Sequence, residues 1–251
     1  MTTTSSALES YRGSHASEGY GGHYDGTYRQ GYYHYQWEYL EKPLLKSVFA
    51  AIPNRASKDY LDFACGTGRI ISVGAGLFRS ATGVDISESM LREARGKADT
   101  AEFIQRDITR EPLDRQFDVI TAFRFFLNAE PELSSAVLRE LHARLKPDGL
   151  LIANIHMNSA SVTGLAYRLR NAFAGRTIAK VRSLADFTRQ LDEHGFRIVQ
   201  IHWYSVLPRT GWRLGWIPKY LMKPVEAMAR RVPGFMRFSQ SFLLVCEKAA
   251  P

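Results

Sequence analysis

A carboxylate and two glycines stand close together in the stretch DFACGTGR, which runs from Asp62 to Arg69. The apolar residues around Asp62 predict a buried strand over 60–64, so the glycines fall in a strand-to-helix turn. Glycine there lets the backbone approach a ligand closely and tolerates positive φ. Asp85 follows Gly68 by 17 residues, and an acid at this place accepts hydrogen bonds from ribose hydroxyls in nucleotide-binding α/β folds. The pattern predicts a site for a ligand that contains ribose.

The composition of the turn disfavours a dinucleotide. A dinucleotide-binding turn has the pattern GxGxxG, whose third glycine packs the helix against the strand, whereas Ile71 occupies that position here. Asp62 would also lie near the pyrophosphate at the start of the helix and repel it. S-Adenosylmethionine carries an ammonium, a sulfonium and a ribose but no phosphate. The pattern therefore favours S-adenosylmethionine over NAD.

Five segments, in this order along the chain, resemble motifs of the class I S-adenosylmethionine-dependent methyltransferases. They are residues 62–68, 83–87, 105–108, 117–120 and 145–150. Together they resemble the glycine motif, the ribose-binding motif, the adenine-contacting motif, the fourth strand and the turn before the fifth strand. The similarity covers roughly residues 55–155 and implies that the chain is a methyltransferase of this Rossmann-like family.

The resemblance implies which residues hold the methionine part of the cofactor. The backbone around Ala64, Gly66 and Gly68 would lie against it. Asp62 would lie near its amino group. The alternative for Asp62 is an ordinary carboxylate at the end of a strand.

The resemblance also assigns the nucleoside part. Asp85 would hold the ribose hydroxyls, and Ile86 and Met90 would flank the adenine. Asp107 would accept a hydrogen bond from the adenine amino group, with the backbone of Ile108 beside it. For Asp85 and Asp107 too, the alternative is an ordinary strand-end carboxylate.

Several classes of methyl acceptor are disfavoured by what the chain lacks. Enzymes that methylate exocyclic amino groups of bases carry an Asn/Asp-Pro-Pro-aromatic turn after the fourth strand, where this chain has AFRFF at 122–126. Methylation at C5 of cytosine uses a thiolate near the fourth or fifth strand, but Cys65 and Cys246 lie elsewhere. No acid occurs between Asp118 and Glu130 to serve as a metal ligand, so we expect no metal.

Direct displacement of the methyl group by an acceptor oxygen or nitrogen remains, and such catalysis rests largely on positioning. An oxygen acceptor can also require a base. His156, just past the fifth expected strand, is the first candidate and His34 the second. Either histidine could instead be structural or solvent-exposed. Arg124 could line the pocket or pair with a surface carboxylate.

The elements that position these residues alternate regularly between strand and helix. Strands are expected at 60–64, 81–85, 101–105, 117–122, 150–155, 196–206 and 239–247, with helices at 69–77, after Ser87, at 131–145 and at 183–194. This alternation predicts an α/β fold with a mostly parallel sheet and helices on both faces. The last two strands lack a strong connecting helix, so the last strand is expected to run antiparallel. The resemblance implies seven strands in all.

The chain of 251 residues suits one such domain. Residues 1–40 are expected to hold a disordered N-terminus, over 1–23, and an aromatic segment, over 24–37. That segment is either a lid that orders over a ligand or a helix pinned to the surface by its rings. The methyltransferase domain would occupy 41–251 and contain insertions at about 156–182 and 207–238.

Positive charge is concentrated in these two insertions. The net charge is +8. Residues 164–182 contain five Lys or Arg and no acid, and residues 207–238 contain seven with one acid, Glu226. Such basic amphipathic segments suit an acidic amphiphile or a membrane surface. They could instead grip RNA, which we disfavour, or simply pack on the domain.

The remaining composition indicates the cellular compartment of the protein. Two cysteines without paired spacing make a disulfide framework and a zinc site improbable, which fits a reducing compartment. No run of about 18 apolar residues or apolar signal core is present. We therefore expect a cytoplasmic protein.

Taken together, the sequence predicts O-methylation of a small-molecule acceptor, which could be a natural-product intermediate, a lipid or a glycan precursor. Two alternatives stay open. One is an RNA methyltransferase that uses the basic segments, and the other is a non-catalytic S-adenosylmethionine-binding protein.

Overall fold

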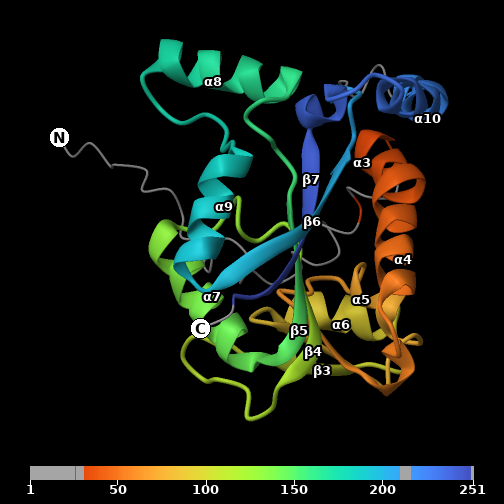
Figure 1. The fold of residues 1–251 in the computed structure, drawn as a ribbon, viewed down its shortest axis with the longest axis vertical. Helices are drawn as coiled ribbons and strands as arrows, with labels where there is room; N and C mark the ends of the chain where they lie inside the picture. Colours follow the sequence, from red (N-terminus) through yellow and green to blue (C-terminus); the bar gives the residue numbers. More distant parts are fainter. Residues whose placement is uncertain (1–25, 27–30, 210–215, 250–251) are drawn as a thin grey trace.

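A sheet of seven strands forms the centre of the computed structural model, which describes residues 26, 31–209 and 216–249 (Figure 1). The strand order is β3-β2-β1-β4-β5-β7-β6. The strands are β1 (Asp59–Phe63), β2 (Ser80–Asp85), β3 (Glu102–Gln105), β4 (Phe117–Ala122), β5 (Leu145–Ile155), β6 (Phe196–Tyr204) and β7 (Ser241–Lys248). β7 runs antiparallel to both of its neighbours, β5 and β6, whereas the other neighbouring pairs are parallel. The predicted fold class, including the antiparallel last strand, is confirmed.

Helices cover both faces of this sheet (Figure 1). The α-helices are α3 (Gly31–Gln36), α4 (Lys42–Ala51), α5 (Ile71–Gly74), α6 (Glu88–Arg95), α7 (Pro131–Arg144), α8 (Val162–Ala174), α9 (Leu184–Glu193) and α10 (Trp216–Arg230). A π-helix, η1 (Trp37–Glu41), joins α3 to α4, and short 3₁₀ helices lie at η2 (Arg55–Ser57) and η4 (Phe235–Phe238). α7 and α9 pack on one face and α4 and α5 on the other.

The core is apolar on both sides of the central strands. In β4, Val119 and Ile120 are fully buried and belong to the clusters on opposite faces. Alternate residues of a strand point to opposite faces, so a strand covered by helices on both sides is apolar throughout. Leu138 and Leu141 of α7 fill one face, and Phe49 of α4 fills the other.

Three local predictions need correction. The helix expected at 69–77 is only α5, because positive φ at Gly68 keeps the preceding turn non-helical and the chain turns again after Gly74. Ser87 stands at the N-cap of α6, but its hydroxyl accepts no helix N–H and lies 3.1 Å from the Ser89 hydroxyl. β5 begins at Leu145 rather than residue 150, because Leu145 already pairs with Phe117 before a register shift.

The predicted disordered N-terminus and the beginning of the aromatic segment lie outside the described residues. The described part of that segment is the helix α3. Tyr32 of α3 is buried, and its hydroxyl lies 2.6 Å from Ser205 Oγ and donates to Leu207 O at 3.0 Å. This arrangement corresponds to the pinned-helix alternative.

Each of the two basic segments contains a helix within its described residues. α8 follows the end of β5 and α10 follows the end of β6, and both lie at the top of the molecule in Figure 1. β5 and β6 both point toward this end. No helix in the described part of the chain is long and apolar enough to cross a membrane.

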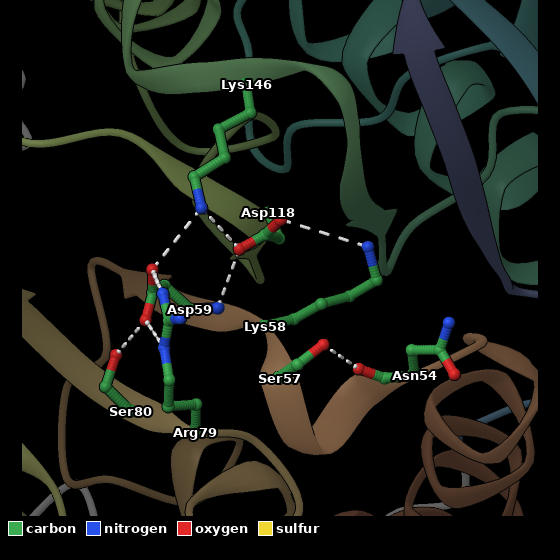
Figure 2. A network of polar contacts seen from close by, with 8 residues as sticks. All are labelled: Asn54, Ser57, Lys58, Asp59, Arg79, Ser80, Asp118 and Lys146. Atoms are coloured by element: carbon green, nitrogen blue, oxygen red, sulfur yellow. Dashed lines mark hydrogen bonds and ion pairs between the residues drawn. The ribbon is translucent and has the colours of Figure 1, made fainter.

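The opposite end of the sheet carries a network of charges (Figure 2). Lys146 Nζ donates to Asp118 Oδ2 at 2.7 Å and to Asp59 Oδ2 at 3.3 Å, and so joins the amino ends of β1, β4 and β5. Asp59 also accepts from Arg79 and from Ser80 Oγ. The hydrogen bond from Arg79 lowers the pKa of Asp59 to about 2.

Candidate functional site

The turn after β1 has the strained backbone that its glycines predict. Ala64, Gly66 and Gly68 all have positive φ, at 52°, 53° and 77°. A Cβ added to Gly68 would lie 2.8 Å from the Cα of Ala94 in α6, so this glycine permits close packing of the turn on a helix. A Cβ added to Gly66 would meet nothing within 4 Å. Gly66 therefore combines a left-handed backbone with open space beside it.

Asp85 at the end of β2 lies next to this turn. Its Oδ2 accepts a hydrogen bond from the Gly66 N–H at 2.9 Å, and its Oδ1 accepts from the Ser87 N–H at 2.9 Å. Each carboxylate oxygen can accept more than one hydrogen bond. The carboxylate is therefore fixed by backbone groups and can accept hydrogen bonds from a further ligand.

A cleft opens at the carboxyl ends of β1 and β2. Its lining brings together five of the predicted residues: Ala64, Asp85, Ile86, Asp107 and Ile108. Six further residues line it to which the sequence assigned no role in the site: Phe63, Val84, Arg106, Phe125, Leu133 and Val137. Five of these six are apolar, so the cleft has few polar groups.

Four predicted residues do not line this cleft: Gly66 and Gly68, which belong to the turn described above, and Asp62 and Met90, which are buried. Met90 is 2% exposed and faces the interior from α6. Asp62 is 1% exposed; its Oδ2 accepts from the Ile71 N–H at 3.0 Å and its Oδ1 from Thr121 Oγ1 at 2.6 Å. Burial raises the pKa of Asp62 to about 7. Asp62 thus ties the start of α5 to β4 and positions the turn from beneath.

Asp107 lies at the rim of the cleft, just past β3. Its Oδ1 accepts from the Thr109 N–H at 3.0 Å and from Thr109 Oγ1 at 2.6 Å, and its Oδ2 lies 3.6 Å from Arg110 Nε. Ile108 beside it is 1% exposed and forms part of the apolar wall. The loop therefore fixes the Asp107 carboxylate through Thr109.

A second group of polar side chains is buried near the carboxyl ends of β4, β5 and β6. We call Glu41, Arg124, Asn154, Tyr204 and His156 the acceptor-side cluster. Glu41 Oε2 accepts from Arg124 Nη2 at 3.1 Å, and Oε1 accepts from Asn154 Nδ2 at 3.0 Å and from the Tyr204 hydroxyl at 2.8 Å. Glu41 is fully buried. Four segments distant in sequence therefore meet at one carboxylate.

The backbone around this cluster is unusual at two places. Glu41 ends the π-helix η1, a feature often found at functional sites. Arg124, directly after β4, has φ 58°, and its N–H donates to Asn154 Oδ1 at 2.7 Å. Burial raises the pKa of Glu41, but the positive charges of Arg124 and Arg69 lower it by a larger amount. The pKa of Glu41 therefore lies below its ordinary value. Glu41 is therefore an ionised carboxylate at neutral pH.

His156 follows β5 beside this cluster. Its Nδ1 is buried and has no hydrogen-bond partner among the described residues. Burial, and then the charge of Arg124, lower the pKa of His156 to about 3. The imidazole is therefore neutral at pH 7, and its buried nitrogen can hydrogen-bond to a ligand. His34 lies in α3, with its ring 5.1 Å from that of Tyr35.

Sequence reasoning missed Glu41, Asn154 and Tyr204. None stands in a motif, and only their contacts with Arg124 and with one another reveal them. Within the described ranges, no group of three or more His, Cys, Asp or Glu side chains could hold a metal ion.

Comparison with known proteins agrees with this geometry. Residues 61–149 match the model of the methyltransferase domain family. Thiocyanate methyltransferase 1 of Arabidopsis thaliana is 32% identical over 111 residues, which is 42% of this chain and 49% of that protein. Its Brassica oleracea counterpart is 34% identical over 155 residues, or 59% and 63% of the two chains. The first of these matches spans only about half of the relative's length.

The fold recurs in solved methyltransferase structures. Magnesium protoporphyrin IX methyltransferase from Synechocystis PCC 6803, solved with bound SAH, aligns with a TM-score of 0.55 at 19% identity and covers 83% of each chain. The predicted resemblance is confirmed, and the chain carries a methyltransferase domain on the class I, S-adenosylmethionine-dependent methyltransferase fold.

Proposed function

We propose that this protein is an S-adenosylmethionine-dependent methyltransferase that methylates an oxygen of a small-molecule, natural-product, lipid or glycan-type acceptor without a metal. The observation that carries the proposal is the cleft itself, in which left-handed Ala64 of the glycine turn, the Asp85 carboxylate and an apolar wall meet. Cys65 and Cys246 are both free and buried, which is consistent with action in a reducing compartment such as the cytoplasm.

The residues fit S-adenosylmethionine in charge and in shape. Gly66 leaves open space where a side chain would stand, so the methionine part can approach the backbone. Asp85 can accept from ribose hydroxyls while it keeps its two backbone hydrogen bonds. Ile86 and Ile108 offer an apolar wall for adenine, and Asp107 lies beside it. Asp62 supports the turn from within the core, and Met90 is buried in α6 without lining the cleft.

When bound, S-adenosylmethionine supplies an electrophilic methyl group. The chain itself then positions the acceptor, excludes water and accepts the proton that the acceptor oxygen loses. His156 is our candidate base, because its neutral imidazole places a buried Nδ1 without a partner near the acceptor-side cluster. The segments 156–182 and 207–238 would act as cap insertions over the acceptor.

The charges around His156 favour an acidic acceptor. Two cations, Arg124 and Arg69, act on His156, against the single carboxylate of Glu41. A neutral imidazole with a pKa of about 3 is a weak base. An anionic group on the acceptor would offset the arginines and raise the pKa of His156 toward the range in which general bases work.

The nature of the relatives supports a small acceptor. Thiocyanate methyltransferase 1 and magnesium protoporphyrin IX methyltransferase are both named for small molecules. Among the classes considered from the sequence, a small-molecule O-methyltransferase therefore stands ahead of an RNA methyltransferase.

The test is methyl transfer from S-adenosylmethionine labelled on its methyl group, with a lysate separated into lipid, small-molecule, RNA and protein fractions. Label in the lipid or small-molecule fraction is the expected result. Label confined to RNA would establish the alternative acceptor. Cofactor binding by calorimetry, without transfer to any fraction of several lysates, would instead indicate a non-catalytic binding protein.

A further inference from the structure

We propose that the exposed apolar face of α8 docks on the surface of an anionic lipid membrane. Four apolar side chains of this helix face solvent: Val162 is 66% exposed, Leu165 51%, Leu169 53% and Phe173 90%. They are three or four residues apart, the spacing that places side chains on one face of a helix. The helix therefore presents a continuous apolar stripe outward.

The apolar stripe of α8 is not the partly exposed edge of a face that packs on the core. Within α8, only Gly164 is buried. An amphipathic helix of a globular protein normally buries its apolar stripe and exposes its polar side. α8 instead exposes its apolar stripe together with the arginines beside it, and it stands at the periphery of the molecule in Figure 1. A surface outside this chain is the natural partner of such a face.

Polar contacts attach the opposite side of α8 to the protein. The Thr163 hydroxyl donates to Gln240 Oε1 at 3.0 Å, just after Ser161 Oγ caps the start of the helix by accepting from the Gly164 N–H at 3.0 Å. Farther along, Asn171 Nδ2 donates to Ala179 O at 2.9 Å, and Asn171 Oδ1 accepts from the Ile178 N–H at 2.8 Å. The helix is thus braced from behind by polar groups, which fixes the outward direction of the apolar stripe.

The charges beside the stripe specify an anionic partner. Residues 156–182 contain no Asp or Glu. Arg168, Arg170 and Arg176 are exposed, and none of them has an ion-pair partner among the described residues. Arg168 and Arg170 flank Leu169, so their aliphatic stems can lie along the apolar surface while the guanidiniums reach lipid phosphates. A basic helix with this arrangement lies in the plane of a membrane interface.

α10 adds exposed aromatic and basic side chains at the same end of the molecule. Trp216 is 57% exposed and Tyr220 62% exposed, and aromatic residues of this kind favour the boundary between lipid and water. Lys219 and Lys223 accompany them on exposed positions. Both helices follow strands that end at the candidate site, so a docked membrane would face the acceptor side.

A membrane accounts for these observations better than RNA does. Phosphates explain the arginines, and aromatic side chains can stack on bases. Aliphatic residues such as Val162, Leu165 and Leu169 gain nothing from either contact, but they gain free energy on transfer into the acyl region. The proposal is independent of catalysis, since it concerns binding alone.

The test is co-flotation of the full chain with vesicles of phosphatidylcholine alone and of phosphatidylcholine containing phosphatidylglycerol. We expect binding to the anionic vesicles only. Phe173→Glu should lower the apparent affinity about tenfold, the scale of withdrawing one large apolar side chain. Ile201→Glu, at an exposed position on β6, is the matched control and should leave binding unchanged.

A charge series separates the two components of binding. Replacing Arg168 and Arg170 together by Gln should reduce binding to anionic vesicles, while Arg139→Gln, on the exposed side of α7, should not. The proposal is overturned if the chain binds neither vesicle type, or if Phe173→Glu binds as the parent does. It is equally overturned if the α8 face binds only a polynucleotide, with a steep salt dependence, or only a second copy of the chain in analytical ultracentrifugation.

Discussion

Clusters of polar side chains lie at both ends of β4 and β5, and the two clusters differ in how far they are exposed to water. At the amino ends, Asp118 and Lys146 form an ion pair at 2.7 Å with side chains 18% and 34% exposed. Beyond the carboxyl end of β4, Arg124 pairs with Glu41 at 3.1 Å with side chains 10% and 0% exposed. Water reaches the first pair, which also belongs to a wider network with Asp59 and Lys58. The second is out of water and depends on Asn154 and Tyr204 for its remaining hydrogen bonds.

This difference separates a network that holds strands together from one that can serve a site. A half-exposed pair costs little to form and contributes little. A buried pair carries a large desolvation cost, and well-packed apolar residues of the same volume are often as stable. Stability alone therefore does not explain why the ion pair of Glu41 and Arg124 is buried.

The first prediction concerns the two ion pairs and has the largest expected effect. Glu41→Gln leaves Arg124 buried without its counter-charge and should lower the free energy of unfolding by about 3–5 kcal/mol. Asp118→Asn, the matched change at the exposed end, should cost about 1 kcal/mol or less. Urea denaturation of both variants checks this. Equal losses would show that the two ends do not differ as their burial indicates.

The second prediction tests the acceptor side itself. His156→Ala should lower kcat by about 100-fold or more, the usual contribution of a general base, and leave the Kd for S-adenosylmethionine unchanged. Added imidazole should restore part of the turnover, which a purely structural role would not allow. His142→Ala, at a half-buried histidine of α7 near Gly195, is the control. Unchanged kcat in His156→Ala would remove it as the base.

The third prediction tests the cofactor side. Asp85→Ala should weaken S-adenosylmethionine binding by about 1–3 kcal/mol, the cost of losing a charged hydrogen bond. Calorimetric titration measures this directly. Asp148→Ala, at an exposed carboxylate in the stretch 147–149, should bind the cofactor as the parent does. If the two variants bind alike, the ribose does not lie against Asp85.

The fourth prediction is the smallest and depends on pH. The pKa of His156 is about 3 in the folded protein against an ordinary value of 6.5. Between these values the unfolded chain binds the extra proton, so this contribution to stability is complete above pH 6.5 and is lost as the pH falls. From pH 7.5 to 5.5 the loss should be about 1.4 kcal/mol.

His156→Leu isolates this contribution. Asp62, with its pKa raised to about 7, has the opposite effect, because its folded form holds a proton that the unfolded form has released. Since Asp62 is present in both proteins, its contribution cancels in the difference. Unfolding free energies measured at the two pH values should fall less steeply in the variant. Parallel curves would contradict the low pKa of His156.

The cofactor side was predictable because its signals are local. Gly66 and Gly68 stand two residues apart in a turn, and Asp85 ends the adjacent strand, so spacing and residue type suffice to bring them together. The alternation of strands and helices was readable for the same reason. Asp62 and Met90 were recognised as motif residues, but their burial depends on Thr121 and on packing that no local pattern records.

The acceptor side was not predictable because its contacts are remote in sequence. Glu41 is separated from Arg124 by 83 residues, from Asn154 by 113 and from Tyr204 by 163. No periodicity links positions so far apart, and a lone glutamate in YLEKP resembles a surface residue. His156 and Arg124 were singled out only because they follow expected strands. The partner that fixes Arg124 could be identified only from the folded chain.

The position of β7 has a consequence for biosynthesis. Among the described strands, β6 pairs with β7 alone, and β7 lies between it and β5. During translation, β6 therefore leaves the ribosome before any strand can receive it, and the outer edge of β5 stays open as well. At ordinary elongation rates, the 36 residues between β6 and β7 take about 2–7 seconds to synthesise. Two unpaired strand edges are exposed for that time, and binding of a chaperone in this interval would protect the nascent chain from aggregation.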